Sequence, residues 1–179
     1  MTRRQLLLYA ALPLAYVAVG RLGLLLATPP GYASAVFLPA GIAVTATFVA
    51  RASALPGTFF GSFLLNLWMG YLIAGRFNSI QIMAALVIAA GSMTQAAIGG
   101  TALRRAAGDP VPFDNASHIV VFFLLTPVFC LTSATISVGG LWEVGALEWT
   151  DVATNWTTWW LGDTLGVLFA LPAILMLTL

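Results

Sequence analysis

Long apolar stretches separated by short polar segments dominate the pattern along this chain. Each stretch holds about 18–26 residues, the length that a helix needs to cross the roughly 30 Å hydrocarbon core of a bilayer. The six stretches cover residues 5–27, 33–50, 55–75, 79–101, 115–140 and 154–178. The runs are continuous, whereas the strands of a membrane barrel alternate in polarity. The pattern therefore predicts an all-α, polytopic transmembrane helix bundle of about six spans.

The arginines predict how these spans are oriented. Short loops on the cytoplasmic side of a membrane protein carry an excess of Lys and Arg. With a cytoplasmic N-terminus, the inner side holds Arg3, Arg4, Arg51, Arg104 and Arg105, and the outer side holds Arg76 and Arg21. The acidic 141–153 loop then lies outside. The chain is predicted to have both termini in the cytoplasm.

The composition excludes most other classes of protein. Hydrophobic residues make up 60% of the 179 residues and charged residues 7%, whereas a soluble domain carries about 25% charged residues. The formal charge of +1 provides no basic surface for nucleic acid. Cys130 is the one cysteine, so a disulfide framework and a cysteine metal site are excluded.

Small residues at four-residue spacing predict close helix packing. Such pairs let two helix backbones approach each other in lipid. They are Gly57 and Gly61 in the third span and Gly162 and Gly166 in the sixth. The packing is expected within one chain, and a homodimer face is the alternative.

Two charges inside the spans need a partner, because a charge at such depth costs about 2.5–3.5 kcal/mol on insertion scales. Asp163 lies about nine residues past Thr154, or roughly 13 Å along the helix. Arg21 lies at a similar depth in the first span. We therefore expect Asp163 to pair with Arg21 or with another polar span residue such as Asn66. An Arg21–Asp163 pair is either a structural latch or one wall of a pocket.

The sixth span also predicts a ligand site. Trp156, Trp160 and Asp163 share one helical face at i, i+4 and i+7. Aromatic faces with a few placed polar groups are typical of small-molecule sites. The candidate binding residues are Arg21, Phe37, Pro39, Asn66, Trp156, Trp160 and Asp163. We expect them to line a cavity open to the outer side, and the alternative is a solid cluster without a cavity.

No constellation in the sequence indicates catalysis. Acid–base work needs converging titratable groups, and the spans offer only Asp163 and Arg21. His118 is the one histidine, so a haem or metal role is not expected. The chain is predicted to have no catalytic residue, no metal site and no cofactor.

Three blocks of sequence carry a resemblance to a known family. They are Ala35–Ala43 (AVFLPAGIA), Leu55–Leu67 (LPGTFFGSFLLNL) and Trp159–Leu168 (WWLGDTLGVL). Together they resemble the first type of bacterial membrane-associated sensor domain, the MASE series. The resemblance implies a multi-pass sensory module of the bacterial inner membrane. It also implies signal transduction to a C-terminal histidine kinase, as in two-component systems, or to a cyclic-di-GMP enzyme.

The family pattern implies an output domain that this sequence does not contain. Residues 171–179 end the sixth span without a basic flank. Residues 1–179 are therefore expected to be an integral membrane sensory domain at the front of a longer protein. The expected partners are the lipid bilayer and an unidentified small ligand or membrane protein, with a homodimer possible and no nucleic acid.

A transporter subunit is the alternative from a different class. Six spans in about 180 residues also suit the substrate-binding membrane subunit of a vitamin-type uptake transporter. That subunit would stop soon after residue 179 with a basic tail, whereas a sensor would continue into a linker and an output domain. The reading frame after Leu179 distinguishes the two.

Overall fold

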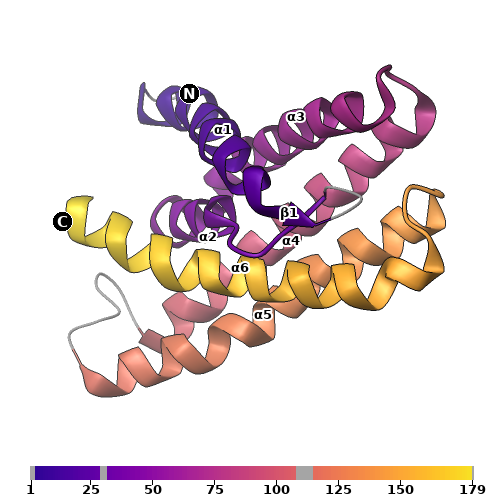
Figure 1. Cartoon of the computed structure of the whole chain (residues 1–179). Coiled ribbons are helices and arrows are strands. Elements are labelled where there is room, and N and C mark those ends of the chain that lie inside the picture. The colour runs from indigo at the N-terminus through magenta and orange to yellow at the C-terminus, as the bar shows by residue number, and fades with distance from the viewer. Residues whose placement is uncertain (1–2, 29–31, 108–114, 179) are drawn as a thin grey trace.

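The computed structural model describes residues 3–28, 32–107 and 115–178, and it shows an all-α bundle (Figure 1). The α-helices in these ranges are α1 (Arg3–Gly23), α2 (Leu38–Ala50), α3 (Leu55–Ala74), α4 (Ser79–Ala107), α5 (Ala116–Glu143) and α6 (Trp149–Thr178). Short 3₁₀ turns follow α1 and α2, namely η1 (Leu24–Leu26) and η2 (Arg51–Ala54). Two-residue strands β1 (Ala27–Thr28) and β2 (Ala33–Ser34) pair antiparallel between α1 and α2.

Four helical stretches in the described residues are long and apolar enough to cross a membrane. They are Leu38–Ala74, Ser79–Ala106, Ala116–Glu143 and Trp149–Leu177, and Ala10–Gly23 is a shorter apolar helix. The chain is thus an integral membrane protein by the length and composition of its helices. Helix α2 has 13 residues and is only about 20 Å long, so it does not cross a bilayer alone. The count of six spans stays a prediction.

The helix ends fall into two groups (Figure 1). The N-terminus, the C-terminus and the α2–α3 junction lie at one end of the bundle, and the α3–α4 and α5–α6 turns lie at the other. Arg104 binds the carbonyl oxygens of Thr47 and Phe48, so the end of α4 lies beside the end of α2. Arg51 and Arg104, which were predicted to lie on the same side of the membrane, are therefore at the end of the bundle that holds both termini.

Which end faces the cytoplasm is a testable prediction. A cysteine that replaces Glu148, in the α5–α6 turn, should react with a membrane-impermeant maleimide added to intact cells. A cysteine that replaces Ser117, in the first turn of α5, should react only after the membrane is opened. Cys130 is fully buried and should not react in either case. The opposite labelling pattern would reverse the predicted orientation.

The second predicted span is wrong at its start, because residues 33–37 are extended and the helix begins at Leu38. Pro39 lies in the first turn of α2, where its fixed φ and missing N–H suit a helix start. The extended backbone that precedes Pro39 packs on the middle of α6. The N–H of Phe37 donates to the carbonyl of Gly162 (2.9 Å), and the Ser34 hydroxyl donates to the carbonyl of Gly23 (2.6 Å).

Glycines in α6 and α3 make these approaches possible. A Cβ on Gly162 would lie 1.9 Å from the Ser34 carbonyl oxygen, and a Cβ on Gly166 would lie 2.0 Å from that of Phe37. Gly61 similarly admits α1, since its Cβ would lie 2.8 Å from the Cβ of Tyr16. Gly57 is buried in the first turn of α3. Non-helical backbone is tolerated at such depth only where protein surrounds it, and the glycine face of α6 provides that surrounding.

Candidate functional site

A buried carboxylate lies at the centre of the bundle. Asp163 is only 3% exposed and sits near the middle of α6. Its carboxylate faces the polar side chains of Ser133 on α5, Gln95 on α4 and Trp159 on α6. The indole N–H of Trp159 donates to the Ser133 hydroxyl oxygen (3.2 Å). Polar side chains on three helices thus surround one carboxylate, which lowers the cost of burying it.

A second buried polar cluster joins α1, α3 and α4. The Tyr16 hydroxyl donates to Ser92 Oγ (3.3 Å), and the Ser62 hydroxyl donates to the same oxygen (3.1 Å). The Asn66 amide donates to the carbonyl of Ser62 (2.8 Å). All four side chains are buried. Because lipid offers no hydrogen-bond partners, polar side chains of this kind turn inward and hold helices together.

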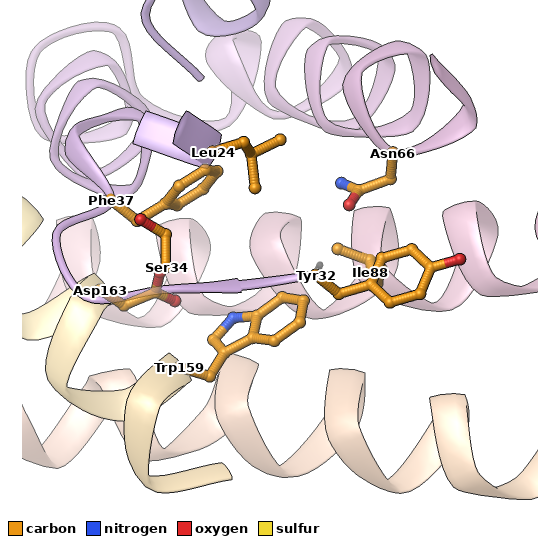
Figure 2. A pocket seen from close by; sticks show the side chains of 8 residues that line it. All are labelled: Leu24, Tyr32, Ser34, Phe37, Asn66, Ile88, Trp159 and Asp163. Carbon is orange, nitrogen blue, oxygen red and sulfur yellow. The ribbon is translucent and has the colours of Figure 1, made fainter. Parts of the chain in front are cut away.

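A small cavity separates the two clusters. It has a volume of about 10 Å³, which is about the space that one water molecule requires. Its lining comes from η1, the extended segment, α3, α4 and α6 (Figure 2). The lining residues are Leu24, Tyr32, Ser34, Phe37, Asn66, Ile88, Trp159 and Asp163. The side-chain oxygen of Gln95, 2% exposed, has no hydrogen-bond partner among the described residues.

The structure brings three of the seven predicted binding residues to this cavity, namely Phe37, Asn66 and Asp163. Pro39 is buried one turn away, in α2. Trp156 and Trp160 stack on each other, with ring centroids 6.1 Å apart. Their indole N–H groups donate to α5, since Trp156 binds Thr135 Oγ1 (3.2 Å) and Trp160 binds the carbonyl of Pro127 (2.8 Å). These two tryptophans therefore join α6 to α5 and do not line the cavity.

The expected ion pair between Arg21 and Asp163 is wrong. Arg21 is exposed, and its guanidinium carbon lies 5.1 Å from the centroid of the Trp68 ring. The residue of α1 that faces the interior is Tyr16, five positions earlier and therefore about 140° around the helix. Asp163 finds its partners in Ser133, Gln95 and Trp159, which meets the broader expectation of a polar partner from another span.

Several residues of the site were not singled out as binding residues from the sequence. The i, i+4 spacing of Trp159 and Asp163 was a usable signal. Ser62 and Asn66 share the i, i+4 spacing, and Ser92 and Gln95 are spaced i, i+3. Tyr32 and Ser34 gave no such signal, because they approach α6 through extended backbone that hydropathy does not distinguish from helix.

The network makes a prediction for Trp159. Trp159→Phe keeps a six-membered aromatic ring but removes the indole N–H, so Ser133, next to Asp163, loses its donor. We expect a loss of about 1–2 kcal/mol in the free energy of unfolding, measured by chemical unfolding in detergent micelles. The matched control is Trp156→Phe, whose N–H bonds at a less buried position, and its loss should be smaller. Equal losses would contradict a special role for the Trp159 donor.

The comparison with known families bears on this site. The MASE1 family model matches residues 6–178, nearly the whole chain. This chain belongs to the MASE1 family. MASE1 domains are membrane sensory domains, so the MASE1 chain is a membrane-embedded module for signal transduction. Comparisons with curated proteins and with solved structures find no match.

The polar groups of the site form a packed cluster. Within the described ranges, no group of three His, Cys, Asp or Glu side chains converges as metal ligands. The polar side chains around Asp163 lie on α4, α5 and α6, so they hold its carboxylate in place between these helices. Such an arrangement is suited to holding helices of this MASE1 domain in one defined packing.

Proposed function

We propose that this MASE1 chain is the sensory input module of a bacterial inner-membrane signalling protein. It perceives a ligand, a lipid or a membrane partner and regulates a C-terminal kinase or cyclic-di-GMP enzyme. The observation that carries the proposal is the contact between the extended segment 32–37 and α6 at Gly162, next to Asp163. Segment 32–37, where the input is proposed to act, and α6, which leads toward the C-terminus, meet at this contact.

The contact links the cavity to the end of α6. Asp163 faces polar side chains on α4 and α5, while the carbonyl of Gly162 accepts a hydrogen bond from the Phe37 N–H. Movement of the extended segment therefore changes the packing of α6 against three elements at once. From Asp163 to Thr178 the helix runs 15 residues, or about 22 Å. A shift at the site is carried along this length as a displacement of α6, which contains Pro172.

The size of the cavity constrains the input. About 10 Å³ holds one water molecule, whereas pockets for vitamin-sized ligands measure about 300–1,000 Å³. A larger ligand enters only if the segment 32–37 moves away from Trp159 and Asp163. The input is thus proposed to select a second state in which this segment is displaced. The MASE1 assignment favours a sensor over the substrate-binding subunit of a transporter.

A reporter chimera tests this function. The chain is joined after Leu179, in continuous helical register, to a diguanylate cyclase domain, and cyclic-di-GMP is measured in cells. Asp163→Asn replaces one of the two carboxylate oxygens by an NH₂ group, which donates hydrogen bonds. The variant should change the cyclic-di-GMP output by at least about threefold, which corresponds to a population shift of roughly 0.7 kcal/mol. Asp151→Asn, an exposed carboxylate in the first turn of the same helix, should leave the output unchanged.

Membrane abundance of both variants is measured in the same cells. Unchanged output from Asp163→Asn at parental abundance would refute the proposed role of this site. An equal change in output from Asp151→Asn would show that charge on α6, and not the buried site, determines the output.

A further inference from the structure

A groove on the surface of the bundle lies between the end of α1 and the second half of α3. Its volume is about 810 Å³. The lining residues are Ala18, Arg21, Leu22, Leu24, Leu25, Trp68, Met69 and Leu72. Leu25 is 80% exposed and Leu22 67% exposed. The groove is therefore an apolar surface with a single charged side chain in it.

The charge in this groove has no anionic partner within the described part of the chain. Among the described residues Arg21 makes no ion pair, and its recorded contact is with the ring of Trp68. Trp68 lies six residues before Ala74, the last residue of α3, which places it about 9 Å below the end of that helix. An arginine at this depth needs an anion or water. The cation–π contact holds the guanidinium at the groove but does not neutralise it.

We propose that the groove between α1 and α3 binds an anionic phospholipid. The guanidinium of Arg21 donates to the phosphate, and one acyl chain lies along Leu22, Leu25 and Leu72. Charge complementarity selects this occupant, because the groove combines one unpaired cation with an apolar floor, and a phospholipid combines one anion with apolar chains. Arginine fits a phosphate through its fork of N–H donors.

Trp68 adds a second polar handle to the lipid site. Its side chain is 45% exposed, and no hydrogen bond from its indole N–H occurs within the described part of the chain. Indole rings at the edge of the hydrocarbon core commonly direct this group to lipid headgroups. Arg21 and Trp68 thus present donors from α1 and α3 to one bound headgroup.

The groove shares a wall with the buried site. Leu24 lines both the groove and the cavity beside Asp163. A bound acyl chain therefore packs on one side of η1 while the cavity lies on its other side. This coupling rests on the proposed sensory function, whereas lipid binding itself does not.

Native mass spectrometry of the full 179-residue chain in detergent tests the binding. The lipids are phosphatidylglycerol as the anionic probe and phosphatidylcholine as the zwitterionic comparison. Arg21→Gln should weaken the apparent Kd for phosphatidylglycerol about tenfold, because a charge-assisted hydrogen bond is lost. Arg76→Gln removes the same charge from the α3–α4 turn at the same end of the bundle, and it should weaken binding less than about twofold.

Two further variants test the geometry. Arg21→Lys keeps the charge and loses the guanidinium fork, so its Kd should fall between those of the parent and Arg21→Gln. Trp68→Leu keeps the groove apolar and should weaken binding about threefold. Thermal unfolding of each variant is measured without added lipid. An unfolding temperature equal to that of the parent would show that the loss of affinity comes from binding and not from folding.

Three results would overturn the proposal. Equal losses for Arg21→Gln and Arg76→Gln would show general attraction of anionic lipid to this end of the bundle. Equal affinity of the parent for both lipids, unaffected by Arg21→Gln, would show that the groove does not recognise an anion. A dimer that Leu22→Arg converts to monomer, with no lipid retained by the parent, would place a second copy in the groove. The binding assay needs no output domain, so its failure is distinct from failure of the sensory function.

Discussion

Gly162→Ala should destabilise the bundle by about 3 kcal/mol or more, among the largest losses expected for a single methyl group. The added Cβ would lie 1.9 Å from the carbonyl oxygen of Ser34. That oxygen belongs to backbone, so the contact is not relieved by a change of rotamer. Helix α6 would have to move away from segment 32–37, and the hydrogen bond from Phe37 to Gly162 would be lost with it.

Gly139→Ala is the matched control for this prediction. Gly139 lies in α5, and a Cβ there meets nothing within 4 Å. The control should be neutral, or stabilising by up to about 1 kcal/mol from helix propensity. Unfolding of each protein is followed by circular dichroism in mixed detergent micelles. If Gly162→Ala unfolds at the same denaturant concentration as Gly139→Ala, the close packing of segment 32–37 on α6 is contradicted.

The helices themselves could be predicted because lipid imposes a simple rule. A spanning segment has to satisfy its own backbone, so a long apolar run is read as a helix. The sixth span was predicted to start near residue 154, yet α6 begins at Trp149. The first turn of α6 contains polar residues such as Asp151, so the apolar run begins after it. Hydropathy indicates which residues lie in the membrane and not where a helix starts.

The extended segment before α2 could not be predicted for a related reason. Residues 33–37 are mostly apolar and therefore look like the start of a span. What makes them extended is a contact with Gly162 and Gly166, more than 120 residues later in the chain. A non-local contact of this kind leaves no periodicity in the segment itself, and the pairing of glycines with extended backbone becomes visible only in the fold.

The depth of the site residues in the membrane could be predicted, but the direction in which each side chain points around its helix could not. Asp163 and Asn66 were expected near the middle of the bundle, and both lie there, beside the cavity. Trp159 and Trp160 differ by about 100° around α6, and the position of Ser133 on α5 decides that Trp159 faces Asp163. Arg21 was placed at a suitable depth but points away from the interior. Rotation depends on neighbouring helices, which a single sequence does not place.

The partners of Asp163 can be distinguished by two double-mutant cycles. Asp163→Ala removes the carboxylate beside the donors Gln95, Ser133 and Trp159, at an expected cost of about 3 kcal/mol. Gln95→Ala in the same chain removes one of those donors. The double variant should therefore lose less stability than the sum of the two single variants, by about 1–2 kcal/mol.

The second cycle combines Asp163→Ala with Arg21→Ala and serves as the control. Arg21 contacts Trp68 at the surface, so the two losses should add within about 0.5 kcal/mol. Both cycles are measured by unfolding in the same mixed micelles, which makes their coupling energies directly comparable. Coupling with Arg21 that equals or exceeds coupling with Gln95 would mean that the buried carboxylate is stabilised by the distant cation. Coupling with Gln95 alone would instead mean that α4 and α6 are held together through Asp163, as a site that joins these helices in one packing requires.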